Sequence, residues 1–178
     1  MSRRIAVMGP SCSGKTTLAE ALAGRLDVPH VELDALHHGP DWREASADEL
    51  LAKIAALAGL DGWVVDGNYM GKIGTYVVER ADTIVWLDLP LRVCLRRMWR
   101  RSSGRIRDRT ELWGTGNRET WPNFLFKPRG LLIYSLRTHR RRRREWPHLL
   151  GGPKLVRLQS EEEVSRWAAE LPRPRAPE

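Results

Sequence analysis

The segment at residues 9–16 constrains this chain more than any other part of its sequence. It reads G-P-S-C-S-G-K-T and matches the pattern G-x-x-x-x-G-K-[ST] at every fixed position. A short apolar run at residues 5–8 precedes it, and leucines four apart on one helical face follow it at residues 18, 22 and 26. This order of strand, glycine-rich loop and helix is the one in which backbone N–H groups surround a phosphate. The sequence therefore predicts a phosphate-binding loop, or P-loop.

Each residue of the P-loop has an expected part in holding the phosphates of ATP. The glycines let the backbone curl so that its N–H groups point at the β-phosphate, and the start of the helix adds its positive end. Lys15 would bridge the β- and γ-phosphates, Thr16 would give its hydroxyl to Mg²⁺, and Thr17 would reach the α-phosphate. The predicted nucleotide-binding residues are Gly9, Ser11, Cys12, Ser13, Gly14, Lys15, Thr16 and Thr17.

Strand and helix patterns alternate along the rest of the chain. Strands are predicted at residues 30–34, 63–66, 83–89 and 154–158, and helices at 46–59, 73–80, from Pro90, at 131–146 and after Ser160. Ser46 with Glu49, and Ser160 with Glu163, have the spacing of helix capping boxes. Strands that are apolar on both faces and alternate with helices predict an α/β protein with a parallel sheet covered on both sides.

Length and composition indicate a single domain. The chain has 178 residues, 42% of them hydrophobic, which is enough for one continuous core. We expect one kinase-sized domain at residues 1–171, with a mobile lid insertion at about 102–128 and a disordered tail at 172–178. The longest apolar runs have about five residues, far below the roughly 20 that cross a bilayer. A cytoplasmic protein with no membrane partner is therefore predicted.

Three aspartates stand at or near the ends of predicted strands: Asp34, Asp66 and Asp88. The carboxyl ends of parallel strands face the ligand crevice of an open sheet, so the three side chains are expected near the phosphates. A carboxylate there can steady Mg²⁺ or accept the proton of an attacking hydroxyl. We expect Asp66 to join Thr16 at the metal, with Asp34 as the alternative. The alternative is that these aspartates only cap helices. Asp88, two residues before Pro90, is best suited to that role.

The loop after the second predicted strand is expected to border the acceptor. His37 and His38 follow Asp34, but adjacent histidines point to different sides, so a metal site there is not favoured. Trp42 could stack on a planar acceptor or simply pack against the fold. The predicted substrate-binding residues are Asp34, His37, Trp42, Asp66, Gly67 and Asn68.

Arginine supplies most of the formal charge of +8, which should attract polyanions such as nucleotides and nucleic acids. Arginines crowd the helix after Pro90 and the lid, where a guanidinium could stabilise the charge of phosphoryl transfer. Five more form a run that points all round a helix, which predicts a mostly solvated surface with weak, non-specific nucleic-acid affinity. That run is Arg140, Arg141, Arg142, Arg143 and Arg144.

Several segments together resemble the adenylate-kinase-like proteins labelled DNA topology modulation proteins. They are the P-loop, L-D-A-L-H from Leu33, W-V-V-D-G-N-Y from Trp63, W-L-D-L-P from Trp86 and G-N-R-E from Gly116. The resemblance covers residues 4 to about 170. It implies a nucleoside-monophosphate-kinase-like P-loop NTPase fold, with a five-stranded parallel sheet of order 2-3-1-4-5 and an arginine-rich lid. By that resemblance Arg97, Arg101 and Arg118 are the lid arginines that act on ATP.

The departures from that family concern the acceptor. Adenylate kinases read D-G-F-P-R after the third strand, whereas this chain reads D-G-N-Y-M from Asp66 and lacks the arginine. The segment at Asp34 is closer to the substrate aspartate of shikimate-kinase-like enzymes. The acceptor could therefore be a neutral hydroxyl compound, or a phosphate held by Arg43 or Arg80.

These patterns predict a P-loop kinase that uses ATP and Mg²⁺ to phosphorylate a small molecule, either a nucleoside monophosphate or a hydroxyl compound. Lys15, Asp34, Arg97, Arg101 and Arg118 are the predicted catalytic residues. No guanine-reading N-K-x-D tetrapeptide is present, which disfavours a GTPase. The alternative is a nucleic-acid-binding regulator that uses ATP only as a conformational signal.

Overall fold

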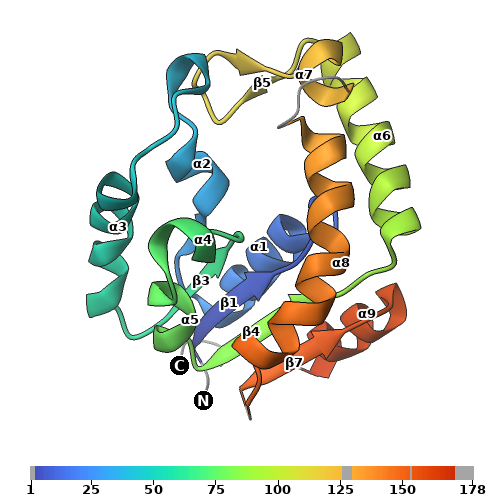
Figure 1. Ribbon diagram of the computed structural model, residues 1–178. Helices are drawn as coiled ribbons and strands as arrows, with labels where there is room; N and C mark the ends of the chain where they lie inside the picture. The colour runs from blue at the N-terminus through green and yellow to red at the C-terminus, as the bar shows by residue number, and fades with distance from the viewer. Residues whose placement is uncertain (1–2, 126–129, 153, 171–178) are drawn as a thin grey trace.

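The computed structural model describes residues 3–125, 130–152 and 154–170, and its centre is a parallel sheet of five strands (Figure 1). The strand order is β2-β3-β1-β4-β7. The bounds are Arg4–Met8 for β1, His30–Glu32 for β2, Trp63–Asp66 for β3, Thr83–Leu87 for β4 and Leu155–Leu158 for β7. All neighbouring pairs are parallel. The predicted α/β fold and the order 2-3-1-4-5 are confirmed, since β7 is the fifth strand of this sheet.

Helices cover both faces of the sheet. On one face lie α1 (Lys15–Leu26) and α9 (Glu161–Glu170); on the other lie α3 (Ala47–Ala55), α4 (Met70–Ile73), α5 (Tyr76–Arg80) and α8 (Leu131–Leu149). The other helical segments of the described chain are α2 (Leu33–His37), α6 (Leu91–Arg107), α7 (Trp121–Leu125) and the short 3₁₀ turns η1 (Pro40–Trp42) and η2 (Ala56–Gly59). The expected capping box of Ser46 and Glu49 begins α3.

The central strands are apolar on both faces, as a doubly covered sheet requires. In β3, for example, Val64 packs toward α1 while Val65 packs into the core under α4 and α5. Side chains alternate between the faces of a strand, so the same short run fills both cores. Asp66 ends β3 and Asp88 follows β4, and this edge of the sheet carries the candidate site.

Two predicted strands are shorter than expected, and one predicted helix is divided into two. The strand predicted at 30–34 ends at Glu32, because Leu33 turns into the core and the chain enters α2, which places Asp34 in a helix. The helix predicted at 73–80 is two helices, separated by Gly74 with φ 59°. Such a backbone angle cannot continue an α-helix. The strand predicted at 83–89 ends at Leu87.

Two helices are longer than expected. The predicted lid insertion begins later than residue 102, since α6 continues through Ser102, Ser103 and Gly104 to Arg107. A glycine inside a helix costs only about 1 kcal/mol relative to alanine, and tertiary packing can offset that cost. Ser102 is fully buried, which fits a helix held by its neighbours. The basic helix α8 likewise continues to Leu149, with Pro147 in its last turn.

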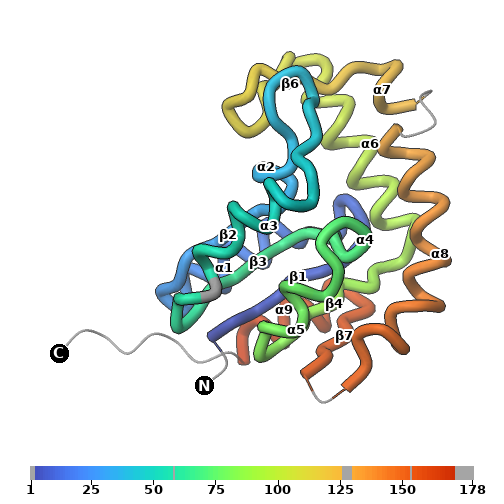
Figure 2. The backbone as a smooth tube through the Cα atoms, turned by 60° about the vertical axis from the view of Figure 1, so that its left-hand side comes forward, coloured from blue at the N-terminus to red at the C-terminus, as the bar shows by residue number. Residues whose placement is uncertain are grey.

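The predicted lid is built from regular elements where the structure describes it. After α6, strands β5 (Glu111–Leu112) and β6 (Asn117–Arg118) form an antiparallel hairpin, and α7 follows. The hairpin crosses from α6 to the loop after α2, as both views show (Figures 1 and 2). Residues 126–128 of the predicted lid and the predicted tail at 172–178 lie outside the described residues. Within the described residues, every helix is too short or too polar to cross a membrane.

Candidate functional site

The P-loop turns between the end of β1 and the start of α1 as the sequence predicts. Gly9 has φ 155° and Gly14 has φ 94°, conformations that side-chain-bearing residues rarely adopt. A Cβ atom on Gly9 would also lie 2.8 Å from the carbonyl oxygen of Leu87. These two glycines therefore allow the loop to curl against the sheet.

Lys15, the first residue of α1, folds over the loop and donates a hydrogen bond to the Pro10 carbonyl oxygen at 3.0 Å. Burial lowers the pKa of its ammonium group, while the carboxylates of Asp34 and Asp66 act in the opposite direction. Lys15 therefore lies close enough to both predicted site aspartates for their charges to act on its pKa. The structure brings these three predicted residues together, although they are far apart in the sequence.

Asp66, at the end of β3, is almost fully buried and bonded from two sides. It accepts a hydrogen bond from the Thr16 hydroxyl at 2.7 Å, and the Nε2 atom of His30 lies 3.1 Å from its other oxygen. Magnesium prefers a few hydroxyl and carboxylate oxygens and keeps the rest of its shell for water and phosphate. The pair of Thr16 and Asp66 fits that donor set. His30 was missed by the sequence analysis, which had no signal for it.

Asn68 and Gly67 sit directly after β3, and both face the P-loop side of the edge. The Asn68 amide accepts a hydrogen bond from the Gly9 N–H at 3.0 Å and donates one to the Gly9 carbonyl. Gly67 has φ 138°, and a Cβ atom there would lie 2.8 Å from the Cβ of Leu33. Asn68 therefore holds the P-loop backbone, which differs from the direct acceptor contact expected for it.

Asp34 faces the crevice from the opposite side. It accepts a hydrogen bond from the Tyr69 hydroxyl at 2.7 Å. Burial, followed by the nearby Asp34 carboxylate, raises the pKa of Tyr69. The tyrosine therefore stays a hydrogen-bond donor and fixes the orientation of the Asp34 carboxylate. Tyr69 is a second residue that the sequence analysis missed.

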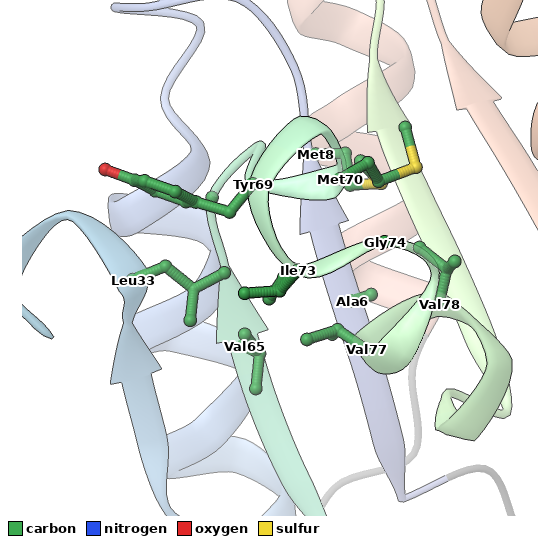
Figure 3. A pocket seen from close by; sticks show the side chains of 11 residues that line it. Ala6, Met8, Leu33, Val65, Tyr69, Met70, Ile73, Gly74, Val77 and Val78 are labelled. Atoms are coloured by element: carbon green, nitrogen blue, oxygen red, sulfur yellow. The ribbon is translucent and has the colours of Figure 1, made fainter. Parts of the chain in front are cut away.

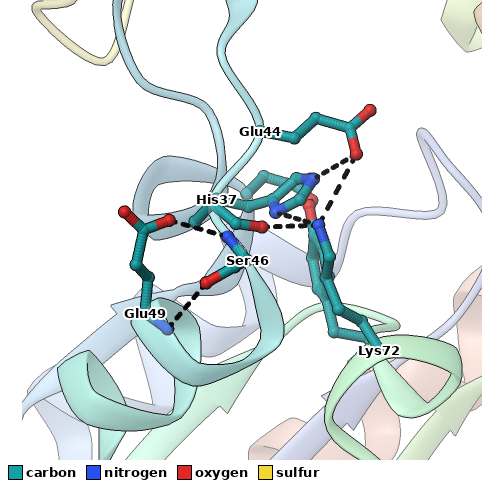
Figure 4. A network of polar contacts seen from close by, with 8 residues as sticks. His37, Glu44, Ser46, Glu49 and Lys72 are labelled. Carbon is teal, nitrogen blue, oxygen red and sulfur yellow. Dashed lines mark hydrogen bonds and ion pairs between the residues drawn. The ribbon is translucent and has the colours of Figure 1, made fainter.

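His37 belongs to a polar network beside Asp34 (Figure 4). Its Nε2 lies 3.5 Å from a carboxylate oxygen of Glu44, and the Nζ of Lys72 lies 3.5 Å from both His37 Nδ1 and Glu44. Burial lowers the pKa of His37, and Lys72 adds to the effect. The ring of His38 meets that of His37 edge-on at 4.7 Å, so the two histidines are in contact rather than divergent. Across the described residues, no group of three or more His, Cys, Asp or Glu could hold a metal ion.

Next to this network lies a small apolar hollow between α4, α5 and the sheet (Figure 3). Its lining includes Leu33, Val65, Met70 and Ile73, and the Tyr69 hydroxyl points away from it toward Asp34. The hollow has no charged lining residue. It therefore belongs to the core beneath the site and cannot bind a phosphate.

Asp88 is 1% exposed and is bound by arginines. Arg143 Nε lies 3.0 Å from one of its oxygens, and Arg157 binds the other at 2.6 Å. Its carboxylate is thus occupied by α8 and β7 and is not free to cap α6 or to face the phosphates. Asp34 and Asp66 remain as the two carboxylates of the crevice.

The three predicted lid arginines lie in different surroundings. Arg97 is bonded to Glu161 at 2.8 Å and reaches the Ser13 carbonyl of the P-loop at 3.4 Å. Arg101 is exposed, but its charge acts on the thiol of Cys12 in the P-loop. Arg118 is exposed on β6. Arg97 and Arg101 therefore lie beside the P-loop, and the contacts of Arg118 do not reach it.

Arg142, on α8, is buried, contrary to the prediction. The sequence analysis grouped it with the solvated run of five arginines. Arg142 is 6% exposed, donates to the Tyr134 hydroxyl at 2.7 Å and lies over the ring of Trp146. Its charge contributes to the lowered pKa of Lys15, and Asp34 in turn acts on the pKa of Arg142. Arg142 is therefore buried against Tyr134 and Trp146, while Arg140, Arg141 and Arg144 are exposed as predicted.

The two arginines named as alternative phosphate ligands lie elsewhere. Arg43 is 71% exposed and pairs with Glu49 at the start of α3. Arg80 stacks on Tyr76 at the end of α5, just before β4 begins, so it lies near the opposite edge of the sheet. The expectation for Arg80 is wrong, because the chain must return to the amino end of β4 there. Lys72 and Arg142 supply the positive charge beside Asp34 instead.

Solved structures of P-loop kinases resemble this chain over nearly its whole length. A gluconokinase from Sinorhizobium meliloti 1021 is 24% identical, with a TM-score of 0.54 and 94% of each chain covered. A shikimate kinase from Acinetobacter baumannii, in complex with shikimate, is 15% identical, with a TM-score of 0.58 and coverage of 96% of this chain and 90% of that one. A shikimate kinase from Bacteroides thetaiotaomicron is 17% identical, with a TM-score of 0.54 and coverage of 95% and 96%.

The sequence itself matches no protein-family model and no curated protein. The resemblance to DNA topology modulation proteins therefore stays a prediction. At these identities the structural likeness establishes the fold, which is that of the small-molecule P-loop kinases.

Proposed function

We propose that this protein is an ATP-dependent kinase that transfers the γ-phosphoryl group to a hydroxyl of a small acceptor. The observation that carries the proposal is the Asp34 carboxylate, which the Tyr69 hydroxyl fixes at 2.7 Å and whose charge acts on the P-loop lysine, Lys15. A P-loop lysine needs a partner group that orients the attacking hydroxyl, and a fixed carboxylate can do so. The likeness to a gluconokinase and to shikimate kinases supports the same reaction class.

The P-loop would hold the nucleotide. Backbone N–H groups and Lys15 would bind the β- and γ-phosphates, and Thr16 and Asp66 would hold Mg²⁺, which would neutralise phosphate charge. His30 keeps the Asp66 carboxylate oriented from the far side. Arg97 and Arg101 lie near enough to the loop to stabilise the transferred group.

The acceptor would lie between Asp34, Lys72 and Arg142. Asp34, held by Tyr69, accepts the proton of the attacking hydroxyl or aligns it. Arg142 offers a planar fork suited to a carboxylate or a phosphate on the acceptor. This pocket favours a hydroxylated acid over a neutral compound, and a nucleoside monophosphate remains the alternative acceptor.

A coupled assay of ADP release with Mg·ATP tests the proposal. The acceptor panel should contain polyhydroxy acids, nucleoside monophosphates and nucleosides. We expect one class to raise turnover well above the background ATPase. The Lys15→Ala variant should lose this activity by at least about 10³-fold while keeping its circular dichroism spectrum, because a P-loop without its lysine cannot balance the phosphate charge. An active Lys15→Ala enzyme would sink the assignment.

A second candidate function is binding of single-stranded nucleic acid along the outer face of α6. Arg92, Arg96 and Arg100 lie on one side of the helix at a spacing of four, exposed and without a partner in the part of the chain that the structure describes. Trp99 beside them is 53% exposed. Arginines with exposed aromatic rings are typical of single-strand binding. Fluorescence anisotropy with a labelled oligonucleotide at 50 and 200 mM salt tests this, and no binding at either salt would exclude it.

A further inference from the structure

The lid hairpin rests directly on the loop that borders the acceptor. We define the acceptor loop as residues 38–44, whose base is closed by a bridge between His38 and Glu44. The hairpin at residues 111–118 comes from the other side of the molecule, at the end of α6, and meets this loop at the top of the crevice (Figures 1 and 2). The residues that form the two hydrogen bonds between these segments are 75 and 78 positions apart in the sequence, so only the fold brings them together.

Asn117 makes the polar part of this contact. Its side chain accepts a hydrogen bond from the Trp42 N–H at 2.9 Å and donates one to the Gly39 carbonyl at 2.8 Å. Asn117 is 3% exposed. A buried amide that satisfies a backbone donor and a backbone acceptor at once fixes the position of the loop it binds.

Trp113 makes the aromatic part. Its ring stacks on that of His38 at a centroid distance of 5.3 Å and meets Trp42 edge-on at 6.3 Å. Trp113 also lies close enough to Glu32, two positions before Asp34, to oppose the rise that burial causes in the pKa of that carboxyl. The hairpin therefore reaches past the acceptor loop to the end of β2.

Backbone strain gathers on both sides of the contact. Asp41 and Trp42 in the acceptor loop have φ 55° and 58°, and Trp113 in the hairpin has φ 53°. Residues with side chains adopt this region at a cost, and they tend to do so where surrounding contacts impose it at clamps and switches. Here the imposing contacts are those between the two segments.

The same hairpin is tied to the nucleotide side. Glu119, next to β6, pairs with Arg105 of α6 at 2.9 Å, and both charges act on Cys12 in the P-loop. The lid segment is thus joined to α6 by the ion pair at one end and to the acceptor loop by Asn117 and Trp113 at the other.

We propose that Asn117 and Trp113 form a latch that makes closure of the nucleotide side and closure of the acceptor side a single event. They are positioning residues, and the inference rests on the proposed kinase function. Nucleotide bound at the P-loop then tightens the acceptor loop through the lid, and an acceptor tightens nucleotide binding by the same factor. Without the latch each side closes independently.

The test is hydrogen exchange of the Trp42 amide, followed by NMR in the full chain with and without Mg·AMP-PNP. In nucleotide-free wild-type protein this amide should exchange at least about tenfold more slowly than in Asn117→Ala, which lacks both hydrogen bonds. Mg·AMP-PNP should slow it further in the wild type and have no effect on it in Asn117→Ala. Trp113→Ala should likewise lose the nucleotide effect.

The controls separate the latch from other outcomes. Asn123→Ala, in α7, should behave as the wild type. Asn117→Asp keeps an acceptor for the Trp42 N–H and should retain part of the protection, which a general loss of lid structure would not allow. If the Trp42 amide exchanges equally fast in the wild type and in Asn117→Ala, or if nucleotide protects it equally in both, the latch is overturned.

The proposed function has a separate readout in the same experiment. The amides of residues 9–17 should shift when Mg·AMP-PNP binds, in the wild type and in Asn117→Ala alike. If they do not shift in either protein, nucleotide binding at the P-loop fails, and the nucleotide-free comparison of Trp42 still decides whether the latch forms.

Discussion

At the scale of single residues, the chemistry of the site depends on which side chains are free to meet a ligand. Asp66 is bonded to Thr16 and His30, and Asp88 is bound by arginines. Among the described residues, the Asp34 carboxylate accepts one side-chain hydrogen bond, from the Tyr69 hydroxyl. A carboxylate bonded by a single neutral donor keeps lone pairs for an acceptor hydroxyl. The three aspartates thus have three different environments, although the sequence gives each of them the same place after a strand.

Arg142 gives a prediction at this scale. Replacing it by glutamine should lower kcat/KM for an anionic acceptor by about 10²–10³-fold, since a charged hydrogen bond to a buried anion contributes on the order of 3 kcal/mol. Arg141→Gln, one position away and exposed, is the matched control and should leave kcat/KM unchanged. Steady-state kinetics with ATP saturating measures the effect. An unchanged kcat/KM in Arg142→Gln would contradict an anionic acceptor at this arginine.

At the scale of elements, the edge strand β7 and the helix α8 share one buried charge at the end of β4, in addition to the pairing of β7 with β4 and the packing of Trp146 in the core. Asp88 follows β4, and it binds Arg157 of β7 and Arg143 of α8. Its own N–H donates to the Leu158 carbonyl at 2.7 Å. Arg157 also lies over the buried ring of Trp86, 4.5 Å from its centroid. The position of α8, and therefore of Arg142, depends on this cluster.

The Asp88 cluster predicts a stability effect. Asp88→Asn leaves Arg143 and Arg157 without a counter-charge and should lower the free energy of unfolding by about 3 kcal/mol, as expected when a buried ion pair is broken. Urea unfolding followed by circular dichroism measures it. Asp108→Asn, whose carboxylate pairs with Arg107 on the surface, is the control and should have no measurable effect. Equal stability of the two variants would mean that Asp88 is not a structural anchor.

At the scale of the whole molecule, buried histidines couple stability to pH. Burial lowers the pKa of His37, His38 and His139 below the ordinary value of about 6.5. The unfolded chain then binds more protons than the folded chain below that pH, so stability is complete above about pH 6.5 and is lost as the pH falls.

We therefore expect the free energy of unfolding to be lower at pH 5.5 than at pH 7.5. Urea titrations at both values measure the difference. His139→Gln removes one of the three groups and should reduce the difference, whereas His148→Gln, at an exposed position, should leave it unchanged. A wild-type protein equally stable at both pH values would contradict this expectation.

The sequence by itself determined the α/β fold, the place of the P-loop between β1 and α1, and the place of Asp66 at the end of β3. These features depend on local signals: glycines that permit a tight loop, strands apolar on both faces, and polar residues where strands end. Residue types that sit next to one another in the chain carry such signals.

The tertiary structure alone decided which distant side chains meet. Nothing near His30 in the sequence indicates its contact with Asp66. The five consecutive arginines of α8 are equivalent in the sequence, but packing of the helix buries Arg142, directs Arg143 to Asp88 and leaves the others exposed. Asn117 and Trp113 gain their partners only because the lid returns to the acceptor loop. A long-range contact depends on how helices and strands pack, and periodicity along the chain does not record it.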